Sequence, residues 1–289
     1  MCIRDRRLPQ YSQKLKLAMN KKYDFLIDTH CHLDFDDYVL DIDAVVKNAL
    51  NANVRYLITI STKFKLFHKI ENLVSRFDNV YCSVGTHPLY IDDEYESYTL
   101  SDLLNACNNS KVVAIGECGL DYSRLKHDNK KEQESMFRLQ IECSNVSGLP
   151  FIIHNRNSDE DMERTLLDEA KKNKLRGVLH CFSSSERLAM VAIDLGLSLS
   201  FTGIITFKNA NSVRDILRKI PNDRIFVETD SPFLAPVPHR GKRNEPSYIT
   251  KIVDKISEVK QLPIAEVINL TTKNSLCLLY TSDAADDRL

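Results

Sequence analysis

Two histidines one residue apart, in the stretch IDTHCHLD at residues 27–34, are the first side chains whose spacing could do chemistry. They follow a hydrophobic run, YDFLI, and successive side chains of a β-strand alternate between its two faces. His30 and His32 would therefore project together from the end of a strand, as a metal-binding pair does. The alternative is a polar strand end with two solvated rings, and this stretch by itself favours neither interpretation.

Further histidines and carboxylates end later hydrophobic runs in the same manner. Five of the eight histidines in the chain occupy such positions, which a random scatter would not produce. Because neighbouring imidazoles and carboxylates gain from a shared cation and otherwise have little reason to converge, this pattern favours a metal site. The residues at the ends of the later runs are His87 in GTHP, Glu117 and Asp121 in GECGLD, His154 in IIHNR, His180 in VLHCFS, and Glu228 and Asp230 in VETDSP.

A centre with two metal ions needs a bridging oxygen ligand, and Glu117, near the middle of the strand order, suits that role. Asp230, on the last strand, would lie beside His30 and His32 and is placed to act as a general base for a water molecule. A metal ion lowers the pKa of bound water to about 7, so the chemistry implied is hydrolysis. The sequence carries no GxSxG elbow, Walker A loop or GxGxxG after a strand that would indicate a rival mechanism.

Basic side chains near these positions are candidates for binding a phosphate group of the substrate. The loop PHRGKRNEP follows the last hydrophobic run and contains Arg240 and Arg243, and a guanidinium group can bind phosphate through two hydrogen bonds. Arg156, in IIHNR, is a further phosphate candidate. His87 could contact the substrate or its leaving group, or could instead cap a loop.

The hydrophobic runs that deliver these side chains number eight, with amphipathic stretches between them. They are nearly continuous in Val, Ile, Leu and Phe, which is typical of parallel strands buried on both faces. Eight such units favour a distorted (β/α)8 barrel of the TIM type, with catalytic groups at the carboxyl ends of the strands, over a doubly wound open sheet. Strands are expected within residues 24–30, 54–61, 79–88, 111–121, 149–156, 176–183, 197–206 and 224–233, and helices within 41–51, 130–147, 159–174, 185–195 and 246–259.

The composition limits the class of protein. The 289 residues are 43% hydrophobic, which suffices for one large core, and barrels of this type commonly have about 250 residues. A net charge of -1 provides no general basic field, so a nucleic-acid substrate would have to be held locally. Eight cysteines without CxxC spacing, no signal peptide and no membrane-spanning run indicate a cytoplasmic protein with no membrane partner. Since no exposed apolar seam stands out, we expect a monomer.

Both ends of the chain are expected to lie outside the folded domain. MCIRDR at the start and CLLYTSDAADD near the end look like translated sequencing adapter. We expect residues 1–22 to be a non-native or disordered extension, with residues 1–6 adapter-like and Met19 as a possible true start. The hydrolase barrel is expected over residues 23–276 and an adapter-like tail over residues 277–289.

The motifs IDTHCHLD, VGTHP, IGECGLDY, IIHNR, LHCFS and ETDSPFLAPVPHRGKRNEP together resemble those of the TatD family of metal-dependent deoxyribonucleases, in the amidohydrolase superfamily. The resemblance covers about residues 24–276, in order and spacing. It implies one or two divalent metal ions per chain, as Mg²⁺, Mn²⁺ or Zn²⁺. The ligands that it implies are His30 and His32 for the first ion, Glu117 as the bridge, His154 and His180 for the second ion, and Asp230 on the first ion, where it also manages the nucleophilic water.

The resemblance further implies an enzyme that hydrolyses ester bonds of DNA, as a 3′–5′ exodeoxyribonuclease acting on single-stranded 3′ ends with Asp230 and Glu117 as catalytic residues. The same residues would serve a metallohydrolase of a small ester, amide or lactone, or of aminoacyl esters on tRNA, and this alternative stays open. A third hypothesis is a non-catalytic binding module on a decayed barrel. All six ligand positions are intact, however, and a decayed site should have lost some of them.

Overall fold

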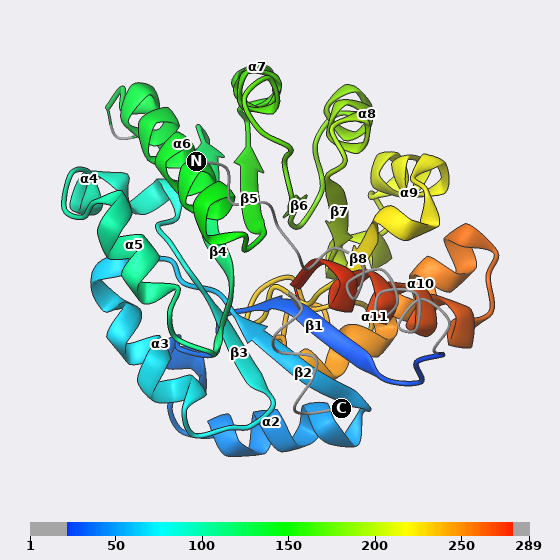
Figure 1. Cartoon of the computed structure of the whole chain (residues 1–289). Coiled ribbons are helices and arrows are strands. Elements are labelled where there is room, and N and C mark those ends of the chain that lie inside the picture. The colour runs from blue at the N-terminus through cyan, green and yellow to red at the C-terminus, as the bar shows by residue number, and fades with distance from the viewer. Residues whose placement is uncertain (1–21, 126, 280–289) are drawn as a thin grey trace, which may run out of the picture.

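The computed structural model of the chain describes residues 22–125 and 127–279 (Figure 1). The expected N-terminal extension, apart from residue 22, and the expected tail, apart from residues 277–279, lie outside the described residues. Residues 277–279 are the last residues of helix α11 (Ile264–Leu279), and the Leu279 side chain is buried in the core. The described helix therefore continues beyond the expected domain boundary at residue 276.

Eight parallel strands form one sheet in which each strand pairs with the next one along the chain. The sheet curves round until its first and last strands meet, so it forms a nearly closed barrel (Figure 1). The predicted (β/α)8 barrel is confirmed, and one strand lies in each of the eight expected runs, with β1 continuing one residue beyond its run to Cys31. The strands are β1 (Leu26–Cys31), β2 (Val54–Thr59), β3 (Val80–Val84), β4 (Val112–Asp121), β5 (Phe151–Arg156), β6 (Gly177–Leu179), β7 (Ser198–Phe201) and β8 (Ile225–Val227).

Helices follow the strands and surround the barrel (Figure 1). The helix expected over residues 159–174 ends at Ala170, because the following KKNK offers no apolar side chain to pack on the barrel. No helix among the described residues has both the length and the apolar composition that a membrane span requires. The α-helices are α2 (Ile42–Asn51), α3 (Phe67–Val74), α4 (Ile91–Glu94), α5 (Leu100–Ala106), α6 (Lys130–Ser147), α7 (Asp159–Ala170), α8 (Glu186–Asp194), α9 (Asn211–Lys219), α10 (Ile249–Lys260) and α11, and the 3₁₀ helices are η1 (Asp36–Tyr38), η2 (Phe64–Leu66), η3 (Pro88–Tyr90), η4 (Gly203–Thr206), η5 (Asn222–Arg224) and η6 (Pro246–Tyr248).

The hydrophobic core has two parts, because strand side chains alternate between the two faces of the sheet. A large cluster joins the outward-facing strand residues to the buried faces of the helices. A smaller cluster takes side chains from the strands, together with Tyr23, Phe25 and Leu279 near the two ends of the described residues. Its strand members include Ile27, Ile58, Tyr81, Val113, Ile152, Val178 and Phe226. This inner layer fills the barrel below the carboxyl ends of the strands, so that end is left for polar side chains.

The barrel closes through an irregular seam rather than a regular ladder. The expected run over residues 224–233 is a strand only as far as Val227, and the chain beyond it makes one isolated bridge to β1, between Cys31 and Ser231. The backbone N–H of Asp230 donates to the carbonyl of His30 at 2.8 Å. Below this point, the buried carboxylate of Asp28 accepts a hydrogen bond from the backbone N–H of Thr229 at 2.9 Å and one from its hydroxyl.

Replacement of Asp28 tests whether this seam holds the barrel closed. Asp28→Ala should lower the free energy of unfolding by about 1–3 kcal/mol, because the buried N–H and hydroxyl of Thr229 would lose their acceptor. Asp28→Asn keeps an acceptor oxygen of the same shape and should retain most of the stability. Urea denaturation of both variants in EDTA measures the effect, and an Asp28→Ala midpoint equal to that of the unaltered protein would contradict it.

Candidate metal centre

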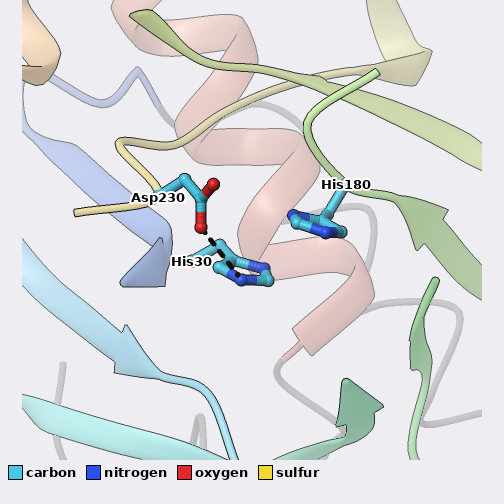
Figure 2. A group of neighbouring side chains, drawn as sticks. All are labelled: His30, His180 and Asp230. Carbon is cyan, nitrogen blue, oxygen red and sulfur yellow. Dashed lines mark ion pairs between the residues drawn. The ribbon is translucent and has the colours of Figure 1, made fainter. Parts of the chain in front are cut away.

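The carboxyl ends of five strands bring the predicted metal ligands to one place. His30 is the next-to-last residue of β1, and His32 lies just beyond the strand. Glu117 lies in β4, and His154 lies in β5. His180 follows β6 directly, and Asp230 lies on the seam after β8. Figure 2 shows that His30, His180 and Asp230, from three separate segments, point toward one another. The structure therefore brings all six predicted ligands together.

Glu117 is the central side chain of this group and is only 2% exposed. Its Oε1 atom lies 2.7 Å from Nε2 of His180 and 2.8 Å from Nδ1 of His154. Its Oε2 atom lies 3.5 Å from Nε2 of His30 and 4.0 Å from Nε2 of His32. The two oxygens thus face two different pairs of imidazoles, which is the arrangement expected of a carboxylate that bridges two cations.

Asp230 completes the half of the centre that contains the first histidine pair. Its Oδ1 atom lies 3.4 Å from Nε2 of His32 and 3.6 Å from Nε2 of His30. Asp230 adopts a left-handed backbone conformation, with φ at 55°, and hydrogen bonds of its N–H and carbonyl hold it there. Such a conformation is costly for a non-glycine residue and is a common feature of functional sites.

Two hydrogen bonds and one ion-pair contact outside the centre indicate which ring nitrogen of three histidines is free to bind a cation. Nδ1 of His32 lies 3.3 Å from the carbonyl of Ile60, and Nε2 of His154 lies 3.0 Å from Asp121. Nδ1 of His180 lies 3.4 Å from Glu228. These oxygens only accept, so each of these nitrogens carries a proton, and in the neutral ring the lone pair of the other nitrogen faces the centre.

Asp121 and Glu228 are functional residues that the sequence analysis noted at run ends but left without a role. Both orient a metal ligand from behind. The sequence offered one sign of this role, which is a spacing that puts each residue on the same strand face as a predicted ligand. Asp121 lies four residues after Glu117, and Glu228 lies two residues before Asp230. Between Glu117 and Asp121, Gly119 allows the close approach of His154, because a Cβ atom at Gly119 would lie 2.0 Å from the His154 carbonyl oxygen.

His87 also reaches the centre, but it directs an N–H donor toward it, whereas the three histidines above direct a ring nitrogen with a lone pair. Its Nε2 atom lies 3.2 Å from Nδ1 of His154 and 3.5 Å from Glu117. Its Nδ1 atom accepts the backbone N–H of Leu89 at 3.0 Å. Because Nδ1 is an acceptor, a neutral His87 ring carries its proton on Nε2 and has no lone pair for a cation there. His87 therefore presents an N–H donor to the centre, and its Nδ1 also caps η3.

The charges of the centre are strongly coupled. Burial acts to raise the pKa of Glu117, but nearby His180 and His87 and the hydrogen bonds from His154 and His180 hold that pKa well below its usual value. Burial acts to lower the pKa of His180, but Glu117 and Glu228 raise it well above its usual value. The carboxylates therefore favour positive charge in the centre. In metal-free protein, protons on the histidines supply this charge, and a bound metal ion would replace them.

The donor set fits divalent cations. Among the described residues, three groups of side chains could each hold an ion with ligand atoms within 4.8 Å of one another, and two of these groups share Glu117. Mixed imidazole and carboxylate donors suit zinc or manganese. The three groups are His30, His180 and Asp230; His30, His32 and Glu117; and His87, Glu117 and His154. The polarity of His87 argues against its being a ligand in the last group.

The three predicted phosphate-binding arginines lie in different settings. Arg156 is exposed and lines a cavity beside the centre. The guanidinium group of Arg243 is paired with both carboxylate oxygens of Asp41, at 2.8 and 2.6 Å, so it holds the loop in place. The guanidinium group of Arg240 lies over the ring of Phe207, 4.4 Å from its centre. Phosphate binding by Arg240 and Arg243 stays a prediction.

Comparison with known proteins places these features in a family. The sequence matches the family described as TatD related DNase over residues 27–280. It is 37% identical to an uncharacterized metal-dependent hydrolase of Bacillus subtilis, YabD, over 86% of this chain and 97% of that protein. It is 38% identical to the uncharacterized metal-dependent hydrolase YcfH of Escherichia coli, over 89% of this chain and 96% of that protein.

Solved structures show the same fold. The TatD homologue YjjV of Escherichia coli superimposes with a TM-score of 0.81 at 28% identity, covering 89% of this chain and 98% of that chain. A TatD family hydrolase from Entamoeba histolytica superimposes with a TM-score of 0.79 at 26% identity, covering 91% of this chain and 100% of that chain.

Metal uptake at this centre should weaken as the pH falls. The raised pKa of His180 means that its ring is protonated at neutral pH in metal-free protein and must lose that proton to bind a cation. The affinity for Zn²⁺ should therefore rise by up to about tenfold per pH unit for each proton displaced, from about pH 6 to about pH 8. Competition with a chromophoric chelator measures this affinity.

His68→Gln provides a control for that measurement, because His68 is exposed on α3. It should preserve both the affinity and the pH dependence, whereas His180→Gln should lower the affinity. An affinity of the unaltered protein that stays flat across this pH range would contradict the proton exchange.

Proposed function

The chain belongs to the family of TatD related DNases and is a metal-dependent hydrolase, and on that premise we propose that it shortens single-stranded DNA from the 3′ end. The bond that it would hydrolyse is the phosphodiester next to the 3′ end of the DNA. The observation that carries this step from hydrolase to nuclease is a polar cavity beside the metal centre, with basic side chains free to bind a polyanion.

The cavity has a volume of about 710 Å³, within the range of ligand sites and large enough for a nucleotide. Residues that lie shortly after two of the proposed metal ligands form part of its wall. Asn155 and Arg156 come after His154, and Ser183 and Ser184 come shortly after His180. A substrate whose phosphate was bound by divalent ions held at Glu117 would therefore extend into this cavity.

The basic side chains of the cavity are available to phosphate. Among the described residues, neither Arg156 nor Lys130 has an ion-pair partner, and Nζ of Lys130 lies 4.6 Å from the centre of the Tyr122 ring. A free guanidinium group and a free ammonium group favour a phosphate backbone over a neutral ester.

Two of the three acidic residues in the cavity wall are already engaged. The carboxylate of Asp159 accepts hydrogen bonds from Asn155 at 2.7 Å and from the backbone N–H of Ser185 at 2.9 Å. The carboxylate of Asp161 accepts the hydroxyl of Tyr122 at 2.9 Å and pairs with an arginine of α7. Glu160 is exposed, and because the donors to Asp159 are neutral that carboxylate keeps its charge. The support for phosphate binding is therefore the placement of Arg156 and Lys130, not a net positive charge of the wall.

Asp230 is the residue we assign to the proton of the attacking water. Burial acts to raise the pKa of its carboxyl group, but the hydrogen bond from His32 and the nearby histidines bring it below the usual value. Asp230 is therefore ionised at neutral pH and can accept a proton. Divalent ions held by the six ligands would supply Lewis acidity toward a phosphoryl oxygen and lower the pKa of water.

His87 is placed to donate a hydrogen bond to the substrate. Burial, partly opposed by Glu117, lowers the pKa of His87 to about 3, so the ring is neutral at physiological pH. A neutral ring with its proton on Nε2 can bind a phosphoryl or leaving-group oxygen but carries no positive charge to compete with a cation. Its role is therefore to orient the reacting group.

We also propose that the protein works as a monomer in the cytoplasm. All six proposed ligands come from one chain, so the centre is complete without a partner subunit. The seven cysteines of the described residues are free thiols, which suits a reducing compartment.

The nuclease proposal predicts a ladder of products from a 5′-labelled single-stranded oligonucleotide incubated with Mn²⁺. EDTA should abolish the shortening, and Asp230→Asn should slow it by about 10²–10⁴-fold, since a general base and ligand would be lost. Asp254→Asn, which changes an exposed carboxylate on α10, is the matched control. Intact DNA under conditions in which the protein hydrolyses a small ester such as 4-nitrophenyl acetate would instead favour the small-ester alternative.

Arg156→Ala tests the role of the cavity. It should lower kcat/KM on an oligonucleotide by about tenfold or more, because a hydrogen bond to a charged group would be lost. The loss should be smaller on bis(4-nitrophenyl) phosphate, which has no second phosphate. Arg156→Lys should restore part of the activity, and Arg218→Ala on α9 is the remote control. Equal losses on both substrates would contradict phosphate binding by Arg156.

A further inference from the structure

An aromatic pair lies against the metal centre on the side away from the cavity. Phe35, in the loop after β1, stacks on His32 with the ring centres 4.7 Å apart and an angle of 25° between the planes. Phe233, in the loop after β8, meets Phe35 edge to face at 5.9 Å and lies 6.2 Å from His32. The two loops are neighbours because β1 and β8 adjoin at the seam (Figure 1).

Phe233 is half-exposed although its backbone is firmly held. Its side chain is 50% exposed. Its N–H donates to the carbonyl of Asp230 at 2.9 Å, and its own carbonyl accepts Nδ2 of Asn244 at 2.6 Å. Asn244 is fully buried and also donates to the carbonyl of Thr229. An apolar ring is thus presented to solvent from a fixed backbone, which reduces the entropy lost when a ligand packs on it.

Exposed apolar side chains concentrate in these two loops. A single exposed apolar residue is ordinary and needs no explanation. Four of the eleven large exposed hydrophobic residues in the described part of the chain, however, lie in the loops that follow β1 and β8. They are Val39, Leu40, Phe233 and Val237. Of the four, Phe233 contacts a ring that stacks on a metal ligand, so it is the one we assign to the substrate.

We propose that Phe233, supported edge to face by Phe35, forms a stacking platform for the terminal base of the DNA strand. This inference rests on the proposed nuclease function. Every nucleobase has an apolar face, so stacking on an aromatic ring binds bases with little regard to sequence. The platform lies on the His32 side of Glu117 and the Arg156 cavity on the His154 side.

A DNA strand that reaches from the platform to the cavity would place its last phosphodiester between them, where divalent ions held by Glu117 and the histidines would lie. The terminal base then rests on the platform, and the preceding nucleotide enters the cavity. A base at a duplex end already stacks within the helix and would have to leave it to reach Phe233. The platform therefore selects unpaired ends.

Two oligonucleotides test this inference with the full chain and Mn²⁺. They share one sequence, and one carries a 3′-terminal thymidine while the other carries an abasic tetrahydrofuran residue in that place. The rate of the first cleavage gives kcat/KM for each. The unaltered protein should prefer the thymidine end by about tenfold, within the range that base stacking on aromatic side chains provides.

Phe233→Ala should bring the ratio of the two kcat/KM values close to one, whereas Phe233→Trp should preserve or increase it. Val146→Ala is the control, because Val146 is 62% exposed near the far end of α6. Metal content and melting midpoint identify a variant that fails to fold. Equal cleavage of both ends by the unaltered protein, or a ratio that Phe233→Ala leaves intact, would overturn the platform. Failure to shorten either oligonucleotide would instead refute the proposed nuclease function.

Discussion

The structure depends above all on one buried carboxylate with imidazoles on both sides. Glu117 directs one oxygen to His154 and His180 and the other to His30 and His32. An ionised group at this depth is tolerable only if positive charge surrounds it. The barrel meets this requirement by ending several strands around one point, and the inner hydrophobic layer beneath excludes water from the other side. The fold and the chemistry therefore both depend on surrounding this one buried carboxylate with positive charge.

The seam between the first and last strands connects stability with activity. The chain after β8 has too few ladder hydrogen bonds to form a regular strand, and the contact of Asp28 with Thr229 compensates for part of them. The same segment places Asp230 in the centre and Phe233 at its edge. The position of these two side chains thus depends on the least regular part of the barrel. A bend there is what allows Asp230 to turn inward in its left-handed conformation.

The sequence was sufficient to predict the eight strands and the convergence of the six ligands, because both depend on hydrophobic runs and on where those runs end. It could not predict the end of β8 at Val227, since the seam is decided by contacts with β1 far away in the chain. The polarity of His87 was also out of reach, as it depends on one N–H from Leu89. Nor could a loop rich in arginine reveal that Arg243 pairs with Asp41.

The chain order of the ligands has a consequence for synthesis on the ribosome. His30 lies in the first strand and His32 just beyond it, whereas Asp230 follows the last strand. The half of the centre that these residues share is therefore divided between the two ends of the domain. A nascent chain can assemble Glu117, His154 and His180 long before Asp230 emerges. The complete centre can therefore form only when nearly the whole domain has been made. A fragment that ends before Asp230 would lack one of the six proposed ligands, so we expect hydrolase activity to begin only when the barrel closes.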